Sequence, residues 1–231
     1  MIEPRDFYAN KFYINPKKRS EKVPFIVNEL VIEKTLSEIL GKPVDMLKTP
    51  MTKEFRIFYS QKSDDVYREM MENSDNFLAE HLLILASSTL NGNLSSTQVI
   101  EYSKKNFLND LNQKPEWYDG SGLSRYNLFT PQSFVQVLTK LYNEFPENRV
   151  FSIFPIGGKT GTIKNRYKDS VVPYIFAKTG TINNNVTLSG YLKTKSGRTL
   201  IFSLLNNNAT KNLSSIRNEN EKLLRLVRDN Y

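Results

Sequence analysis

The stretch VVPYIFAKTGTINNNVTLSGYL, residues 171–192, decides the fold of this chain. It contains two runs rich in β-branched and aromatic residues, and the asparagines at 183–185 between them favour a turn. A third run of the same kind, RTLIFSLLNN at 198–207, follows the turn residues KSG. The three runs predict an antiparallel meander.

Helical patterns flank the predicted sheet in the sequence. Residues 95–111 and 131–145 are amphipathic, and the second pattern starts with Thr130-Pro131, an N-cap followed by proline at the first helical position. The last helical pattern places five apolar side chains on one face: Leu213, Ile216, Leu223, Leu224 and Val227. We therefore expect an α+β fold, an antiparallel sheet flanked by helices.

A further helical pattern, residues 67–90, is interrupted by Ser74-Asp75-Asn76, short polar residues that favour caps and turns. After this break, apolar residues cover most of the helix circumference, which predicts a buried helix. They are Phe77, Leu78, Leu82, Leu83, Ile84 and Leu85. His81 lies among them, so we interpret it as a core histidine instead of the base of a Ser/His pair.

Length and composition indicate an ordinary globular protein. The chain has 231 residues, 39% of them hydrophobic and 24% charged. Residues 1–53 are expected to form an approach segment with one helix, in NELVIEKTLSEIL at 28–40, and residues 54–231 the main domain. No window approaches the ~18 apolar residues of a membrane-spanning helix, and the first residues lack the apolar core of a signal peptide.

Several function classes are disfavoured by the composition. The absence of cysteine and the single histidine argue against disulfides, thiol nucleophiles and paired-histidine metal sites, so we expect no metal and no cofactor. The net charge of +8 is compatible with nucleic-acid binding. Because only NPKKRSEK at 15–22 forms a basic cluster, we interpret the charge as a solvated surface and expect no nucleic-acid partner.

The pentapeptide K-T-G-T-I occurs twice, at 159–163 and at 178–182. The first copy is not a phosphate-binding loop, because Ile153 stands where that motif needs a glycine. A strand-like run precedes only the second copy, and a strand edge can aim a cation and a hydroxyl at a substrate carboxylate. We therefore expect the copy that contains Lys178 to carry the chemistry, and the copy that contains Lys159 to be a coincidence of composition.

Ser-Asp-Asn at a helix break and Lys-Thr-Gly at a strand end belong, together with Ser-x-x-Lys, to the signature of class A β-lactamases and penicillin-binding proteins. From about residue 54 to 205 the chain resembles the D-alanyl-D-alanine carboxypeptidase/endopeptidase family of low-molecular-mass penicillin-binding proteins. Four blocks follow the family's order: MMENSDNFLAEHLL, YDGSGLSRYNLFTP, GTIKNRY and FAKTGTINNNVTLSGYL. The resemblance implies the C-terminal part of a β-lactamase/transpeptidase-like fold.

The resemblance also implies roles for individual residues. Ser74 would relay a proton to the leaving amine, Asn76 would hold the substrate's peptide carbonyl, and Lys178 would supply positive potential. Among the substrate-binding residues, Thr179 would bind the terminal carboxylate and Gly180 would keep the strand surface clear. The backbone N–H of Thr181 would be one donor of the oxyanion hole.

The nucleophile of this mechanism is missing, because no lysine in the sequence has a serine three positions before it. In the family the Ser-x-x-Lys motif lies far upstream, so the chain resembles the C-terminal half of such an enzyme. A truncated gene product, one piece of a split protein and a non-catalytic descendant all remain open. In the family fold, strands of the N-terminal half pair beside the last strand, and without them the run at 198–207 is an exposed edge.

The sequence thus predicts a serine-type D-Ala-D-Ala carboxypeptidase/endopeptidase of peptidoglycan, present without its nucleophile and inactive by itself. The alternative is a non-catalytic module that binds wall peptides or a partner. The expected partners are peptidoglycan peptides, β-lactams and the missing N-terminal half. The substrate implies a periplasmic or other extracytoplasmic location.

Overall fold

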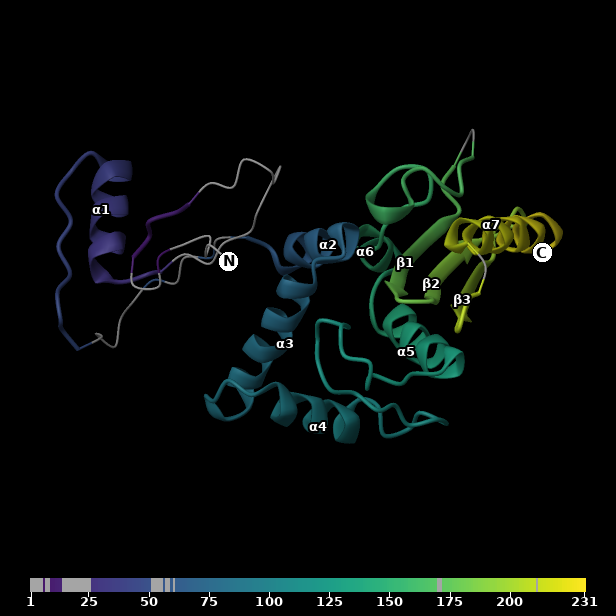
Figure 1. The fold of residues 1–231 in the computed structure, drawn as a ribbon, viewed down its shortest axis with the longest axis horizontal. Helices are drawn as coiled ribbons and strands as arrows, with labels where there is room; N and C mark the ends of the chain where they lie inside the picture. The colour runs from purple at the N-terminus through teal and green to yellow at the C-terminus, as the bar shows by residue number, and fades with distance from the viewer. Residues whose placement is uncertain are drawn as a thin grey trace. The chain divides into compact units, whose positions relative to one another are not determined.

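The computed structural model describes residues 6, 9–13, 26–50, 56, 59, 61–169, 172–210 and 212–231 (Figure 1). The chain forms two compact units, residues 1–58 and residues 59–231. The basic cluster at 15–22 and the expected domain start at residue 54 lie outside the described residues. The division into 1–53 and 54–231 therefore stays a prediction.

In the first unit, the predicted helix is confirmed as α1, Glu29–Leu40. The side chain of Asn28 caps its N-terminus, and Gly41 ends it with a left-handed φ of 62°. No residue of α1 is buried, and Leu30 and Ile39 are 56% and 74% exposed. The described residues therefore leave the apolar side chains of Leu30 and Ile39 largely uncovered.

The second unit is built on a three-stranded antiparallel sheet in the order β1-β2-β3, and the three predicted strands are confirmed. The strands are β1, Ile175–Ile182, β2, Asn185–Lys193, and β3, Thr199–Asn206. Asn183 makes the turn between β1 and β2 with a positive φ of 48°, a conformation that asparagine tolerates. The register pairs Lys178 with Ser189 and Leu188 with Leu204.

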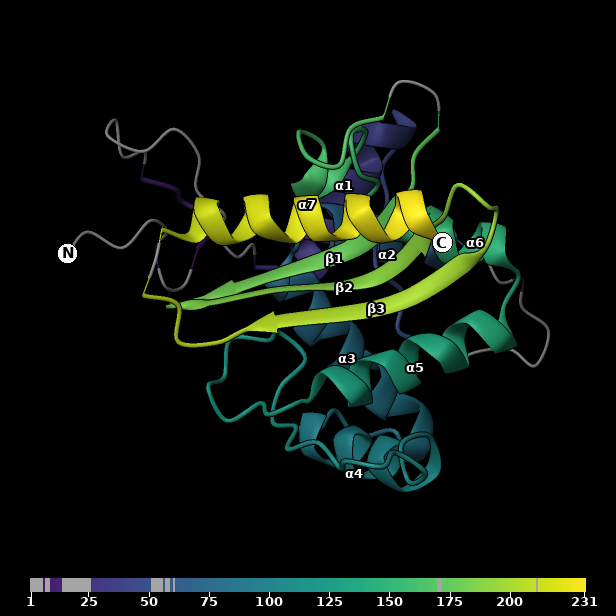
Figure 2. The same cartoon turned by 90° about the vertical axis from the view of Figure 1, so that its right-hand side faces the viewer.

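Helices cover both faces of the sheet and form three layers with it (Figure 2). On one face, α7, Leu213–Asn230, packs Leu224 into a core with Ile175, Ala177 and Leu192. On the other face, the core joins three helices to Tyr191 of β2. These helices are α2, Ser63–Asn73, α5, Pro131–Glu144, and α6, Glu147–Ile153. The predicted α+β arrangement is therefore confirmed for this unit.

The predicted apolar face of α7 needs one correction. Leu224 is buried, but Leu223 is 47% exposed. The sheet-facing positions recur every three or four residues, at 213, 216, 220, 224 and 227. Residue 223 falls outside that series, and the buried position before Leu224 belongs to the polar Asn220.

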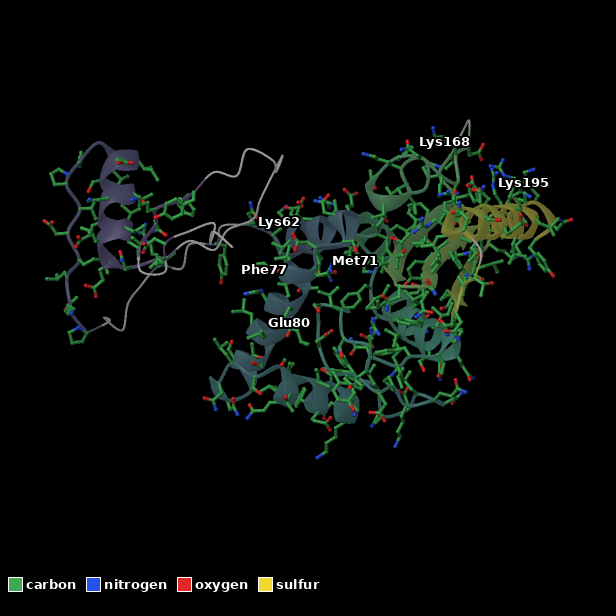
Figure 3. The ribbon with its side chains drawn as sticks, viewed as in Figure 1. Lys62, Met71, Phe77, Glu80, Lys168 and Lys195 are labelled. Carbon is green, nitrogen blue, oxygen red and sulfur yellow. The ribbon has the colours of Figure 1, made fainter. Side chains whose placement is uncertain are left out.

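The pattern at 67–90 forms two helices, α2 and α3, Asn76–Asn91, separated at Ser74-Asp75 as predicted. The expected burial of α3 is wrong, because Ser87 is its only buried residue and Phe77 and Leu85 are 65% and 62% exposed. Figure 3 labels Phe77 and Glu80 on this helix. Its main neighbours in the described structure are α4, Ser96–Asn106, and α2. These neighbours and the loop 116–128 leave the side with Phe77 and Leu85 uncovered.

His81 is likewise not a core residue, because its side chain is exposed. Its Nδ1 lies 2.8 Å from the Phe77 carbonyl oxygen, and its ring centroid lies 3.8 Å from that of Phe77. The ring therefore rests on the exposed surface of α3.

The segment 116–128 is irregular and is closed by a bridge between Glu116 and Leu128. Glu80 of α3 holds this loop, because its Oε2 accepts hydrogen bonds from the N–H groups of Gly120 (2.7 Å) and Ser121 (2.9 Å). The loop is thereby fixed against the helix that starts at the Ser-Asp-Asn triplet.

Candidate active site

The Ser-Asp-Asn triplet forms the junction of two helices. Ser74 ends α2 with the left-handed angles φ 51° and ψ 49°, which are uncommon for a residue other than glycine. Asp75 begins α3, because its carboxylate accepts a hydrogen bond from the N–H of Leu78 at 3.0 Å. Asn76 is the first residue of α3, and its side chain is exposed. A strained residue such as Ser74 suggests a function when other groups converge on it.

Lys178 of β1 reaches this junction from a point 104 residues further along the chain. Its Nζ donates a hydrogen bond of 2.6 Å to Ser74 Oγ and another of 2.6 Å to the carbonyl oxygen of Thr179. Because Ser74 Oγ accepts from the lysine, the hydrogen of the serine hydroxyl is left to point elsewhere. The pair can therefore pass a proton to a third group in the site.

Burial lowers the pKa of Lys178 to about 8. Among the residues that the structure describes, no carboxylate lies within ion-pair distance of its Nζ to offset this effect. The ammonium is therefore a cation that only neutral oxygens stabilise, and its charge is available to an anionic ligand.

The free edge of β1 presents backbone donors next to this lysine. The first part of the edge is covered, since Gly157 N–H bonds to the Ile175 oxygen and Ala177 N–H to the Pro155 oxygen. Outward-directed groups alternate along a strand, so the N–H groups of Thr179 and Thr181 point to the same edge beyond the covered part. A substrate strand could pair there.

Gly180 lies between these two threonines. A Cβ at this position would collide with Oγ1 of Thr187 on the neighbouring strand. Gly180 and Thr181 also line a second pocket, of about 710 Å³, between the β1–β2 turn and the loop 116–128. Packing against Thr187 therefore also requires a glycine at this position, in addition to the clear strand surface expected from the sequence.

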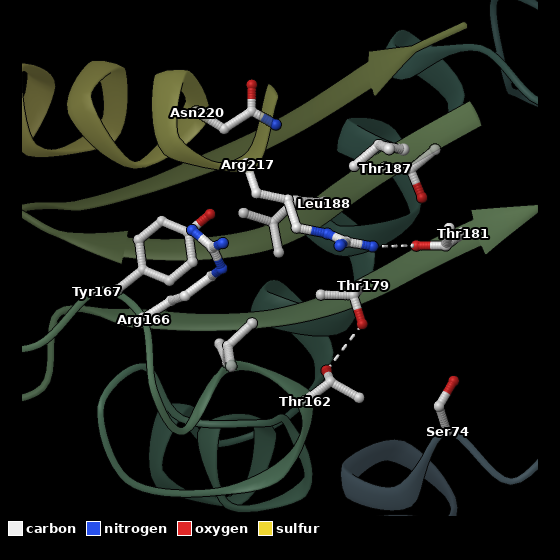
Figure 4. A pocket seen from close by; sticks show the side chains of 12 residues that line it. Ser74, Thr162, Arg166, Tyr167, Thr179, Thr181, Thr187, Leu188, Arg217 and Asn220 are labelled. Atoms are coloured by element: carbon white, nitrogen blue, oxygen red, sulfur yellow. Dashed lines mark hydrogen bonds between the residues drawn. The ribbon is translucent and has the colours of Figure 1, made fainter. Parts of the chain in front are cut away.

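A pocket of about 430 Å³ opens beside Ser74 and extends over β1 and β2 to α7 (Figure 4). Its lining includes Ser74, Thr179 and Thr181 of the predicted site, but not Asn76, Lys178 or Gly180. The structure thus brings Ser74 and Lys178 into direct contact and places both threonines in the adjoining pocket.

Among the pocket residues that were not expected from the sequence, Thr162 and Arg217 contact the two predicted threonines. Thr162 Oγ1 lies 2.7 Å from Thr179 Oγ1, and Arg217 Nη2 donates to Thr181 Oγ1 at 3.0 Å (Figure 4). Thr162 is the second threonine of the first K-T-G-T copy, whereas Lys159 of that copy is exposed. The repeated motif was a signal for Thr162, and nothing in the local sequence distinguishes Arg217 from other arginines.

Within the described residues, no group of three or more His, Asp and Glu side chains could hold a metal ion. None of the helices found there is long and apolar enough to span a bilayer.

Comparisons with known proteins agree on the identity of this region. The model of the D-Ala-D-Ala carboxypeptidase 3 (S13) family matches residues 58–227. The D-alanyl-D-alanine carboxypeptidase DacB of Haemophilus influenzae is 28% identical over 168 residues, which cover 68% of this chain and 34% of that protein. The chain therefore spans about a third of the length of this curated relative.

Solved structures show the same likeness. A crystal structure of penicillin binding protein 4 (dacB) from Haemophilus influenzae has a TM-score of 0.62 and 26% identity, over 71% of this chain and 39% of that chain. A second structure of that protein, complexed with a β-lactam, has a TM-score of 0.65 and 23% identity, over 87% and 50% of the two chains. The predicted fold type is confirmed by these matches.

Proposed function

The chain belongs to the D-Ala-D-Ala carboxypeptidase 3 (S13) family, and on this premise we propose that it supplies one part of a serine-type D-Ala-D-Ala carboxypeptidase/endopeptidase site. The substrates would be peptidoglycan stem peptides, and β-lactams would acylate the assembled site. The observation that carries this proposal is the 2.6 Å hydrogen bond from Lys178 Nζ to Ser74 Oγ. It joins the two family motifs in one place.

In the proposed mechanism, Ser74 passes a proton to the leaving amine while Lys178 holds the serine oxygen and supplies positive potential. Asn76 holds the peptide carbonyl of the substrate. The outward N–H of Thr181 serves as one donor of the oxyanion hole, which the alternation of β1 supports. Thr179 binds the terminal carboxylate with its hydroxyl.

The proposed mechanism also needs a nucleophilic serine with a neighbouring lysine, and the sequence contains no Ser-x-x-Lys. We propose that a serine and lysine of another chain segment complete the site beside Ser74. The β-lactam complex of the Haemophilus influenzae relative supports a β-lactam as the reporter ligand. An extracytoplasmic location is proposed because peptidoglycan lies outside the cytoplasmic membrane.

Intact-mass spectrometry after incubation with benzylpenicillin tests the proposal. We expect no adduct on the chain alone, and a penicilloyl adduct once the nucleophile-bearing part of the Haemophilus influenzae relative is fused upstream. In that fusion, Lys178→Ala should lower the acylation rate at least about a hundredfold, as loss of an electrostatic stabiliser does. Lys222→Ala, an exposed lysine of α7, is the matched control.

An adduct on the unfused chain would show that another residue is the nucleophile and would contradict the proposal. Equal acylation of the Lys178→Ala and Lys222→Ala fusions would remove Lys178 from the mechanism. Both results are read directly from the mass of the protein.

The alternative, a non-catalytic binding module, is favoured by one observation, a pocket that persists without Ser-x-x-Lys. It predicts that the chain binds D-Ala-D-Ala peptides, while the fusion neither hydrolyses them nor reacts with penicillin. The mass experiment therefore separates the two proposals.

A further inference from the structure

The pocket beside Ser74 has the chemistry of an anion site. Two of its lining residues are arginines, Arg166 and Arg217, and none is an aspartate or glutamate. Threonine hydroxyls, among them those of Thr162, Thr179 and Thr181, add neutral donors. Hydroxyl and guanidinium donors without an acidic neighbour favour a carboxylate or another small anion.

The two arginines differ in how their charge is used. Arg166 Nη1 donates to Asn218 at 2.8 Å and lies 3.6 Å from Glu221, so its charge is largely balanced. Glu221 also lies 3.8 Å from Arg225 and accepts the N–H of Tyr167. This glutamate is therefore occupied by Arg166, Arg225 and the Tyr167 N–H.

The charge of Arg217 is not balanced in this way by any described residue. In the part of the chain that the structure describes, no carboxylate lies within 4 Å of its guanidinium, which donates to the neutral hydroxyl of Thr181 at 3.0 Å. A guanidinium has five N–H donors in a rigid fork, which suits two-pronged binding of a carboxylate. The unbalanced charge is directed at the strand that carries Thr179.

The contact between Thr162 and Thr179 concerns the second donor of the pocket, the hydroxyl of Thr179. Their hydroxyl oxygens lie 2.7 Å apart, so one of the two must donate to the other. If Thr162 donates, the hydrogen of Thr179 is free to point into the pocket at an acceptor. In this arrangement, in which Thr162 donates and Thr179 accepts, the first K-T-G-T copy orients the hydroxyl of the second copy.

Resting on the function proposed above, we infer that Arg217 and Thr162 complete the site for the substrate's terminal carboxylate. Arg217 binds the carboxylate directly, together with the hydroxyls of Thr179 and Thr181. Thr162 is a positioning residue that acts through Thr179. This arrangement makes the site selective for peptides whose C-terminus is a free acid.

Calorimetric titration of the intact chain tests this inference with three probes. They are N-acetyl-D-Ala-D-Ala, its C-terminal amide, and the L,L form of the acid. The variants are Arg217→Gln, Arg217→Lys and Thr162→Val, with Arg225→Gln as the matched control on the same helix. The unfolding temperature of each variant is measured alongside, so that a loss of folding is recognised.

We expect Arg217→Gln to bind the acid about 10- to 100-fold more weakly, the usual worth of a charge-assisted hydrogen bond, and to bind the amide as the unchanged chain does. Arg217→Lys should keep an intermediate preference for the acid, because it keeps the charge and loses the fork. Thr162→Val should weaken acid binding by roughly 3- to 10-fold. Arg225→Gln should keep the acid-to-amide ratio.

The inference is overturned if Arg217→Gln keeps the acid-to-amide ratio of the unchanged chain, or if that chain binds no acid peptide. The proposed function is tested by a separate comparison, the D,D form against the L,L form. An acid preference that depends on Arg217 without discrimination between these forms would support the carboxylate site and contradict the peptidase assignment. Discrimination between the D,D and L,L forms, with an acid preference that does not depend on Arg217, would support the peptidase assignment and contradict the carboxylate site.

Discussion

At the scale of one residue, Lys178 keeps a charge in a half-buried position, which lowers the stability of the folded chain. Its ammonium is half-buried, and its two hydrogen-bond partners, Ser74 Oγ and the Thr179 carbonyl, are neutral. Desolvation disfavours the charged form, which lowers the pKa of Lys178 to about 8. A cation kept in this environment is expected to reduce stability in exchange for a potential that a substrate can use.

Replacing Lys178 by methionine is therefore expected to stabilise the chain. At pH 7 the free energy of unfolding should rise by about 1–2 kcal/mol, roughly 2–8 °C in Tm for a chain of this size. The gain should be constant below about pH 8 and shrink toward pH 10.5, because over this interval the native lysine loses its proton while the unfolded one keeps it.

Thermal unfolding of both proteins from pH 7 to 10.5 measures this difference. Lys193→Met is the control, since Lys193 lies 2.6 Å from Glu147 and its loss should destabilise. A gain for Lys178→Met that does not change with pH would mean that burial does not perturb this lysine.

At the scale of elements, α3 carries one predicted site residue and anchors the loop of the second pocket. Its first turn carries Asn76, and its second turn carries Glu80, which holds the loop 116–128 through Gly120 and Ser121. Gly120 allows this close approach, because a Cβ there would lie 2.9 Å from the Ala79 oxygen and from Leu83. The loop lines the second pocket, so the position of this pocket wall depends on the carboxylate of Glu80.

Glu80→Ala is expected to loosen this loop without unfolding the sheet. The N–H groups of Gly120 and Ser121 would lose their acceptor, and each charge-assisted bond is worth about 1.5–3 kcal/mol. Hydrogen exchange of these amides should accelerate at least about tenfold, while exchange in β2 stays unchanged. Glu101→Ala, which removes an exposed carboxylate paired with Lys104, is the control, and equal exchange in both variants would exclude Glu80 as the anchor.

The elements also show how far the sequence predicts this molecule. The strands and most helices follow from local signals such as the asparagine turn at 183–185 and the Thr130 cap. The exposure of Phe77 did not follow, because hydrophobicity does not tell which faces of a helix have neighbours. Arg217 was missed because its contact with Thr181 spans 36 residues and leaves no local pattern in the sequence.

At the scale of the whole molecule, the described surface retains apolar areas. Phe77 and Leu85 stand two turns apart on one side of α3 and are both more than half exposed. The edge of β3 is not paired with a further strand among the described residues. Exposed apolar helix faces and unpaired strand edges favour self-association.

The double variant Phe77→Ser, Leu85→Ser is therefore expected to reduce self-association. Because both side chains are exposed, the cost in stability should stay within about 0.5 kcal/mol per site. Sedimentation velocity at rising concentration measures the effect. Leu226→Ser, an equally exposed leucine of α7 at 62%, is the control. An unchanged concentration dependence would show that α3 does not mediate association.

The hydrogen bond between Lys178 and Ser74 also determines when the site appears during folding. The helices α2 and α3 and the β1–β2 hairpin consist of local contacts and can form early, whereas this bond joins residues 104 positions apart. The pocket therefore exists only after the sheet has docked on α2. The proposed peptide site is absent from the states that precede docking. We therefore expect a peptide ligand to stabilise the folded chain by mass action and slow its unfolding, without accelerating refolding.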